Sequence, residues 1–307
     1  MKRELLLAYL ALTAVCIIWG TTYLALRIAV VHFPPFLFTA LRQTIAGGII
    51  LLFAVFISKA VWPSKAHVLR QAIAGFFMIS LGNGLVAWAE MYIPSGIAAI
   101  ICSMMPVTVI LINISIHREE KPTLPIIAGV ALGLVGIVTI FSEHLHEFSK
   151  AEYLAGIAAI LIAVIAWAGA SIWLKKQNTE SNLYINAGLQ MFFGGLWLYP
   201  VSLVFDNYST ITWSADVIYP FIYLVIFGSI IAYISYSYAL RKLPMTIVSL
   251  YAYINPLVAV LLGWLILDEK LNSKIGIAFI ITVVGIYIVN KGYQQLKEYR
   301  TTLSRSN

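Results

Sequence analysis

Residues 89–119 read AEMYIPSGIAAIICSMMPVTVILINISIHRE, and residues 239–269 read ALRKLPMTIVSLYAYINPLVAVLLGWLILDE. Four residues recur between the two segments at a fixed offset of 150 positions, namely Ala89, Pro94, Pro106 and Glu119, which match Ala239, Pro244, Pro256 and Glu269. Each segment also contains an apolar run of about twenty residues, the length that crosses a bilayer as a helix. The two segments therefore indicate an internal repeat built from membrane helices.

The composition of the whole chain is that of a membrane protein. Of its 307 residues, 61% are hydrophobic and only 11% are charged, and the mean hydropathy is +0.90. These values lie far outside the range of soluble globular chains. A β-barrel would require strands of about ten residues with alternating polarity, and the run 97–116 shows no alternation. We therefore expect an all-α integral membrane protein.

Apolar runs separated by Pro, Gly and charged residues predict ten transmembrane helices in two sets of five. The first set covers residues 5–27, 35–57, 69–92, 95–116 and 123–141. The second set covers residues 153–174, 182–205, 217–240, 245–267 and 273–290. We expect a first five-helix repeat over 1–145, a second over 150–292 and a basic cytoplasmic tail over 293–307.

The distribution of Lys and Arg predicts that both termini are cytoplasmic. In that orientation fifteen of the 20 basic residues fall in inside segments and four in outside segments, while Arg42 lies within a span. The net charge of +7 thus reflects topology rather than nucleic-acid binding. Because five helices per half is an odd number, the second half enters the membrane in the opposite sense. The sequence predicts a multi-pass protein of the cell membrane with inverted repeats, an arrangement seen in many secondary transporters.

Further motifs carry a resemblance to a known family. The first helix contains Ile18-Trp19-Gly20-Thr21-Thr22-Tyr23, and the second contains Leu41-Arg42 followed by Ala46-Gly47-Gly48. The repeat extends to pairs upstream of the opening segments, namely Trp19 with Trp167, Gln43 with Gln190, and Gly47-Gly48 with Gly194-Gly195. With these motifs, and with a Pro followed thirteen residues later by Glu in each half, the chain resembles the EamA-type transporters of the drug/metabolite transporter superfamily. The resemblance implies ten helices, a central cavity, and export or exchange of amino acids and other small metabolites.

Two ionisable residues within spans are candidates for function, because a charge in lipid is costly. Arg42 lies about eight residues into the second span. It either attracts an anionic substrate group such as a carboxylate, or bonds helix-end carbonyls, or extends to the interface. Glu90 near the end of the third span either pairs with Arg42, binds a coupling proton, or is solvated at the interface. Its shallow depth favours the solvated position.

Polar and aromatic side chains within the spans complete the predicted substrate-binding site. The polar candidates are Thr22, Gln43, Asn83, Ser103, Gln190 and Asn255. The aromatic candidates, on helices that the family resemblance places around the cavity, are Trp19, Tyr23, Trp88, Trp167, Tyr233, Tyr236, Tyr251 and Tyr253. Asn83 and Asn255 adjoin Gly and Pro residues, which interrupt helices where transporters bind substrate. The aromatic lining suits an amphipathic or aromatic substrate or a cation, and the alternative role of all these side chains is packing between helices.

Proline and glycine positions suggest where helices bend and pack. Pro106 and Pro256 are expected to kink the fourth and ninth helices at equivalent positions and to act as gate hinges. Gly129 and Gly133 form a seam of small residues on the fifth helix. The seam serves either packing within the chain, which we favour, or dimerisation, so that the protein is a monomer or a homodimer.

No motif of an enzyme or an ATP-driven pump is found in the sequence. His144 and His146 could suggest a metal site, but no second group of ligands supports one, so we expect neither metal nor cofactor. The leading hypothesis is a secondary transporter, and not an enzyme, that exports or exchanges small amphipathic metabolites by alternating access. One alternative is an intramembrane enzyme acting on a lipid-linked substrate, which would need a catalytic pair. Another is a nucleotide-sugar or phosphorylated-metabolite exchanger, which would need basic cavity residues besides Arg42.

Overall fold

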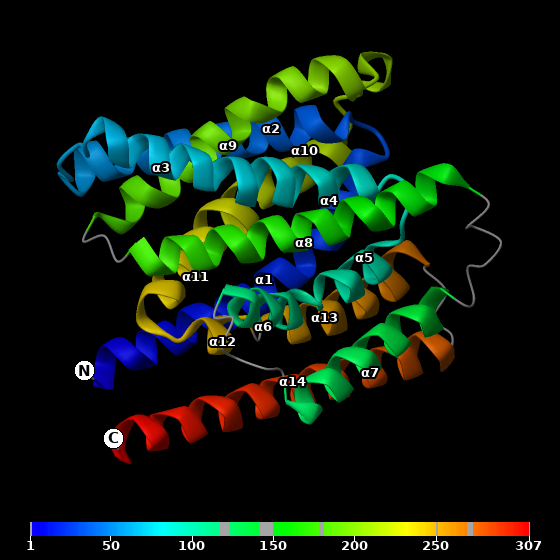
Figure 1. The fold of residues 1–307 in the computed structure, drawn as a ribbon. Helices are drawn as coiled ribbons and strands as arrows, with labels where there is room; N and C mark the ends of the chain where they lie inside the picture. Colours follow the sequence, from blue (N-terminus) through cyan, green and yellow to red (C-terminus); the bar gives the residue numbers. More distant parts are fainter. Residues whose placement is uncertain are drawn as a thin grey trace.

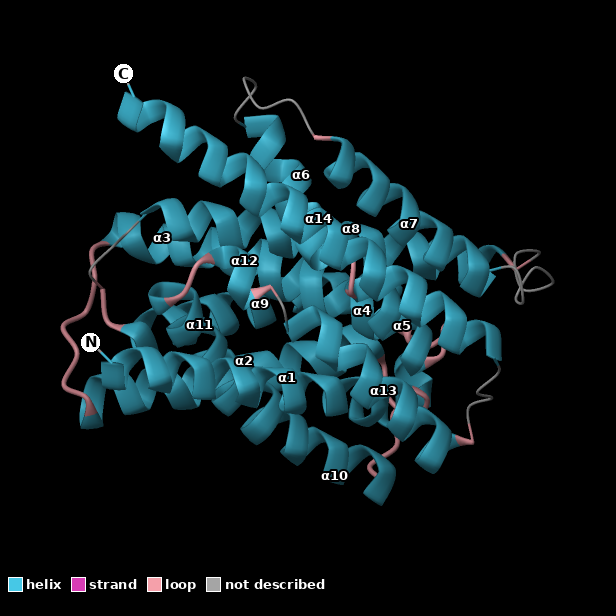
Figure 2. Ribbon diagram, turned by 90° about the horizontal axis from the view of Figure 1, so that it is seen from below, coloured by secondary structure: helices cyan, strands magenta, loops and turns pink. Residues whose placement is uncertain are grey.

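The computed structural model describes residues 2–116, 123–141, 150–177, 181–249, 251–268 and 273–306. All regular secondary structure in these ranges is helical (Figure 2). The helices form one elongated bundle, and the two described ends of the chain lie at the same end of it (Figure 1). The all-α class predicted from composition is confirmed.

The described helices group into ten rods that correspond to the ten predicted spans. The first five rods are α1 (Lys2–Val30); α2 (Pro35–Leu52) with the π-helix η1 (Phe53–Ile57); α3 (Lys65–Gly75) with the π-helix η2 (Phe76–Asn83) and α4 (Gly84–Ala89); α5 (Ser95–Cys102) with α6 (Met105–Ile116); and α7 (Leu124–Phe141). The other five are α8 (Ala151–Gln177); α9 (Leu183–Phe205), followed by the 3-10 turn η4 (Tyr208–Thr210); α10 (Ala215–Tyr223) with the π-helix η5 (Leu224–Ile231) and α11 (Ala232–Lys242); α12 (Met245–Val248) with α13 (Tyr251–Leu267); and α14 (Ser273–Ser306). Seven of the rods are long and apolar enough to cross a membrane, and α7, α13 and α14 contain shorter apolar stretches.

The last helix is longer than its predicted span. The span was expected to end at residue 290, but α14 continues to Ser306. Residues 294–300 read QQLKEYR, which are mostly good helix formers and so continue the helix after the apolar run ends. At 1.5 Å per residue, the 34 residues of α14 span about 51 Å, well beyond the ~30 Å of bilayer hydrocarbon.

The two halves of the chain interleave. The first helix of each half packs against the third and fourth helices of the other half, because α1 contacts α11 and α13 while α8 contacts η2, α4 and α6. The second helices pair as α2 with α9, and the fifth helices pair as α7 with α14 (Figure 1). This reciprocal packing is the arrangement that inverted repeats produce.

The third helix of each half contains a π-helix at the same position. Both η2 and η5 have eight residues, and each bound of η5 lies 148 residues after the corresponding bound of η2. The wider turn of a π-helix displaces backbone hydrogen bonds and side chains, and π-helices are often found at functional sites. Neither π-helix was predicted from the sequence.

The fourth and ninth helices are both interrupted, and the two interruptions lie differently with respect to Pro106 and Pro256. The first interruption lies between Cys102 and Met105, directly before Pro106, which therefore occupies the first turn of α6 where its missing N–H is not needed. The second lies after Val248, and Pro256 is inside α13. The two prolines therefore differ in their place relative to the interruptions, and the kinks and gate hinges expected at Pro106 and Pro256 stay predictions.

Glycines allow the paired helices to approach closely. A Cβ atom added to Gly47 on α2 would lie 2.8 Å from the carbonyl oxygen of Gly188 on α9 and closer still to the Phe192 nitrogen. A Cβ atom on Gly129 of α7 would lie 2.5 Å from the carbonyl oxygen of Gly285 on α14. The predicted glycine seam on the fifth helix thus packs within the chain, as we favoured.

The α2 and α9 pair is tied together at both ends. At one end, the Asp206 carboxylate after α9 accepts hydrogen bonds from the first backbone N–H groups of α2, at 2.7 Å from Leu37 and 3.4 Å from Phe36. At the other end, the Asn182 side chain caps α9 and donates to Ser58 Oγ at 3.4 Å. The N-terminus of α2 therefore contacts the residue after the C-terminus of α9, and the N-terminus of α9 contacts the residue after η1.

We expect Asp206→Ala to lower the free energy of unfolding by about 1 kcal/mol, because α2 loses its cap. Asp206→Asn keeps an acceptor and should unfold near the wild-type temperature. Burial raises the pKa of the Asp206 carboxyl, an effect larger than the opposing hydrogen bonds from Ser202, Leu37 and Phe36. The folded state thus holds this proton more tightly than the unfolded state.

The contribution of Asp206 protonation to stability is therefore greatest below the ordinary pKa of aspartate and declines as pH rises through the folded-state pKa. Thermal unfolding of wild type, Asp206→Ala and Asp206→Asn, measured from below the ordinary pKa of aspartate to above the folded-state pKa, tests the cap and the pH dependence. Equal midpoints for wild type and Asp206→Ala would show that the cap contributes nothing.

Candidate functional site

A cavity of about 100 Å³ lies between the two halves of the chain. Helices α1, α2, α5 and α6 and the third rod of the first half line it, together with α8 and α13 of the second half. Eight of the predicted site residues are on its wall, namely Trp19, Thr22, Tyr23, Arg42, Asn83, Trp167, Tyr251 and Asn255.

Arg42 brings a buried positive charge to this cavity. Its side chain is 5% exposed, and its Nε donates to Ser229 Oγ at 3.0 Å while Nη2 donates to Asn83 Oδ1 at 3.4 Å. Ser229 belongs to η5 and Asn83 ends η2, so both π-helices hold the guanidinium. Nη1 has no hydrogen bond to any described residue. A fixed guanidinium with a free N–H group can bind a carboxylate or another anionic group.

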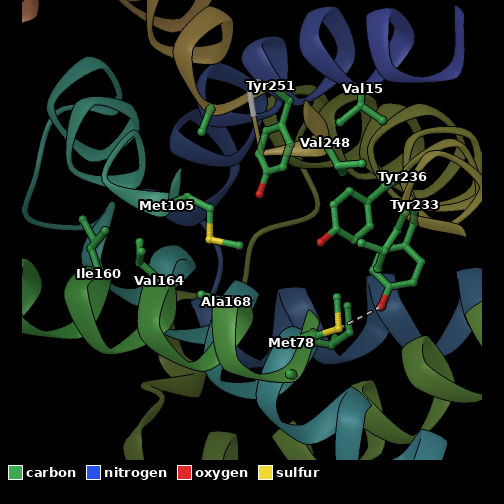
Figure 3. Packing of buried hydrophobic residues seen from close by; sticks show 14 of the residues in the cluster. Val15, Met78, Met105, Ile160, Val164, Ala168, Tyr233, Tyr236, Val248 and Tyr251 are labelled. Atoms are coloured by element: carbon green, nitrogen blue, oxygen red, sulfur yellow. Dashed lines mark hydrogen bonds between the residues drawn. The ribbon is translucent and has the colours of Figure 1, made fainter. Parts of the chain in front are cut away.

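A layer of aromatic rings closes one side of the cavity. The ring of Trp19 lies 5.4 Å from that of Trp167, 5.1 Å from that of Tyr236 and 5.0 Å from that of Tyr251, measured between centroids. The rings of Tyr236 and Tyr251 point into the same space, next to Met105 (Figure 3). The contacts of Trp19 with Trp167 and Tyr251 are edge-to-face, which is favourable packing geometry, and its contact with Tyr236 is tilted.

Hydrogen bonds hold this aromatic layer in place. Trp19 Nε1 donates to the carbonyl oxygen of Gly228 in η5 at 3.0 Å. Trp167 Nε1 donates to the Tyr236 hydroxyl at 3.2 Å, and that hydroxyl also bonds Ser171 Oγ at 2.8 Å. The π-helix η5 therefore holds two cavity residues of the first half, Trp19 through Gly228 and Arg42 through Ser229.

Glu90 is fully buried, so the expectation of a solvated carboxylate at the interface is wrong. Helix α8 packs against α4 next to Glu90, where a Cβ on Gly156 would lie 3.7 Å from Ala89 Cα. Arg27 donates to the backbone carbonyl of Glu90. The Glu90 carboxylate interacts electrostatically with Arg42, and Arg42 lines the cavity.

Comparison with known proteins identifies the repeat. The profile of the EamA-like transporter family matches residues 6–142 and again residues 154–291, which together cover most of the chain. The chain belongs to this family. The resemblance inferred from the sequence motifs is confirmed.

Relatives of this EamA-like chain include an uncharacterized inner membrane transporter, YedA of Escherichia coli (strain K12), which is 32% identical over 94% of this chain and 92% of the relative. The uncharacterized transporter YoaV of Bacillus subtilis (strain 168) is 22% identical over 91% of this chain and 95% of its own length. Protein PagO of Salmonella typhimurium is 28% identical over 89% of this chain and 90% of its own length.

A solved crystal structure has the same fold as this EamA-like chain, with a TM-score of 0.66 at 19% identity over 94% of this chain and 98% of the other. Together with the apolar rods, family membership identifies a multi-pass membrane transporter that resides in a lipid bilayer and acts on small molecules. The family and the names of the relatives indicate a transporter rather than an enzyme.

Several predicted site residues of the EamA-like chain do not line the Arg42 cavity. Gln43 points elsewhere, Trp88 packs on Tyr92 with centroids 5.2 Å apart, and Ser103 Oγ donates to the Ile100 carbonyl one turn earlier. Gln190 and Tyr236 line a second cavity, and Tyr233 bonds Gln190. The predictions outside the described part of the structure are the Tyr253 side chain, His144, His146, Glu119 and Glu269.

The small and apolar part of the cavity wall was not predicted from the sequence. It includes Leu26, Gly82, Val86, Ala99, Cys102, Met105, Ala163, Val164 and Ala252. Such residues are indistinguishable in sequence from others that face lipid or neighbouring helices. Ser229 was also absent from the predicted site, although it bonds Arg42. A polar residue in an apolar span was the only signal for it.

Proposed function

We propose that this chain is a secondary transporter that exports or exchanges small amphipathic metabolites, such as amino acids or related compounds, by alternating access. The observation that carries the proposal is the buried Arg42 guanidinium on the wall of a cavity shared by both halves. The guanidinium binds an anionic group of the substrate, and the rings of Trp19, Trp167 and Tyr251 contact its apolar part.

The aromatic layer supports an alternating-access mechanism. Trp167 lines the Arg42 cavity, and its partner Tyr236 lines a second cavity, so these two rings lie between the two spaces. Rocking of the interleaved halves would move α1 against α11 and α8 against η2. The interruptions near Pro106 and in the ninth helix, with the two π-helices, supply the places where rods bend.

The proposed orientation places both termini in the cytoplasm. The excess of Lys and Arg in the segments on that side supports it. The described residues of the cavity wall come from both halves of one chain, which is compatible with a monomer or a homodimer.

Flux in proteoliposomes tests the proposed function. The purified protein is reconstituted, and uptake of a broad panel of labelled amino acids and related metabolites is measured with and without the panel compound inside. We expect saturable flux of at least one compound. Folded protein that moves none of them would contradict the proposal.

Glu90 is the candidate for proton coupling in this transporter. It is buried, and it interacts electrostatically with Arg42, Tyr23 and Cys102, all of which line the cavity. Protonation of Glu90 would therefore alter the charge that Arg42 presents to a substrate.

We expect Glu90→Gln to remove the pH dependence of flux, because glutamine does not titrate. The matched control is Glu152→Gln on the exposed first turn of α8, which should keep the wild-type pH profile. Flux is measured in proteoliposomes over a range of internal and external pH. Full pH dependence in the Glu90→Gln protein would exclude Glu90 as the coupling group.

The two alternative functions have less support. An enzyme acting on lipid-linked substrates would place a catalytic pair in the cavity, and family membership favours transport instead. An exchanger of phosphorylated substrates would need several cations, and Arg42 is the one Lys or Arg among the described residues of the Arg42 cavity.

A further inference from the structure

A second cavity of about 350 Å³ lies at the end of the bundle that holds the N-terminus. Its lining comes from the third rod, α8, α9 and α11, and so from both halves. Lys242 on its rim forms an ion pair with Glu4 of α1 at 3.4 Å, which places the cavity at that end. Trp167 and Tyr236 separate it from the Arg42 cavity.

The charge on the wall of this second cavity is positive. Lys175, Arg241 and Lys242 line it, and no Asp or Glu is among its described lining residues. Lys175 is held in place because its ammonium donates to the carbonyl oxygens of Leu240 and, at 2.9 Å, Leu243. The Arg241 guanidinium forms no hydrogen bond or ion pair with any described residue, so its N–H groups are available to a ligand.

The floor of the second cavity adds an uncharged donor. Tyr233 donates to Gln190 Oε1 at 2.6 Å, and Gln190 Nε2 donates to Gln71 Oε1 at 2.5 Å. This chain of bonds fixes the Gln71 amide, and its nitrogen donates to no described residue. Gln71 is 2% exposed and lines the cavity. An oriented amide N–H group on the cavity wall, with no acceptor among the described residues, is suited to bind an anionic oxygen.

The remaining wall is largely apolar, although Asn186 and Ser237 also belong to it. Met78, Leu174, Leu183, Tyr236 and Leu240 line it, and Figure 3 shows Met78 next to the hydroxyl of Tyr233. A ligand that fits both surfaces has an anionic group for Arg241 and Gln71 and an apolar body for the opposite wall. A planar carboxylate matches a guanidinium in two parallel hydrogen bonds.

We propose that the second cavity binds the carboxylate of an amphipathic organic anion, as a station separate from Arg42. Gln190 of α9, on the wall of the second cavity, is the counterpart in the repeat of Gln43, the neighbour of Arg42 in α2. The biological role of the second cavity rests on the proposed transport function. In that function, it is a second substrate-binding site, on the side of the aromatic layer where the N-terminus lies.

Ligand binding to the purified full chain in detergent tests this station. The probe is benzoate, the neutral control of the same shape is benzamide, and the readout is the rise in thermal unfolding temperature. Arg42→Gln serves as the background, since it removes the first cation. We expect benzoate, but not benzamide, to stabilise the Arg42→Gln protein. Adding Arg241→Gln should weaken the apparent benzoate affinity about tenfold, through loss of a charge-assisted hydrogen bond.

The matched control is Lys176→Gln in the same background. Lys176 adjoins Lys175 on α8 but is exposed and does not line the cavity, so this variant should respond like its parent. Unfolding temperatures without ligand establish that each variant is folded, and Lys175→Gln provides a second cavity variant.

Three results would overturn the proposal. They are an Arg42→Gln protein that does not respond to benzoate, an equal response to benzamide, or a benzoate response unchanged by both Arg241→Gln and Lys175→Gln. Stabilisation by inorganic phosphate without stabilisation by benzoate would reject the carboxylate. The measurement requires no flux, so its failure is distinct from failure of the proposed transport.

Discussion

Replacing Arg42 by glutamine is expected to reduce transport efficiency by about 10- to 100-fold, the loss that follows from removing a charge-assisted hydrogen bond between the guanidinium and an anionic substrate. The effect should be large because Arg42 is buried, and a hydrogen bond to a charged group is electrostatically stronger in the protein interior than in water. Initial rates of flux in proteoliposomes, at several substrate concentrations, measure the change.

Two further variants separate binding from packing. Arg42→Lys keeps the charge but not the planar fork, so we expect partial activity with a raised KM. Arg70→Gln on the exposed face of α3 removes an equal charge outside the cavity and should leave flux unchanged. If Arg42 serves only to bond Ser229 and Asn83, Arg42→Gln will lower the unfolding temperature without changing KM. That outcome would remove Arg42 from the substrate site.

Substituting Gly47 by alanine is expected to destabilise the fold by about 3 kcal/mol, a large part of the total stability of a typical domain. The added methyl group would lie 2.8 Å from the Gly188 carbonyl oxygen, and closer to the Phe192 nitrogen. Both are backbone atoms of α9, so relief requires separating α2 from α9 along its length. We expect a low yield of folded protein and a lower unfolding temperature.

The adjacent glycine provides the matched control. A Cβ atom on Gly48 would have no neighbour within 4 Å, so Gly48→Ala should be neutral or slightly stabilising. Thermal unfolding of both variants in the same detergent makes the comparison. Equal stability of the two proteins would mean that the α2 and α9 contact is looser than described here.

The helices were predictable from sequence because lipid imposes a length and a polarity on every span. The second rod was predicted at 35–57, and it occupies those residues as α2 and η1. The interruption before Pro106 could be anticipated from the missing N–H group of proline. The π-helices could not, because a change from one hydrogen-bonding register to another has no distinct sequence pattern in an apolar run.

The site was harder to predict than the spans because it depends on how rods turn and pair. Arg42, Trp19 and Trp167 were found from their chemistry and their place in the repeat, and all three line one cavity. Gln190, also found from the repeat, lines the other cavity. The sequence places Gln190 in a corresponding position, but it does not say on which side of the aromatic layer that position lies.

The interleaving of the halves has a consequence for synthesis of the protein on the ribosome. Helix α1 packs against α13 in the folded protein, and about 220 residues lie between the end of α1 and the start of α13. At roughly 5–20 residues per second, translation of that stretch takes about 10–40 s. During this time the first helix has no permanent neighbour on that side, so insertion factors or lipid must shield it. Two half-length chains produced separately should accordingly need one another to complete either half.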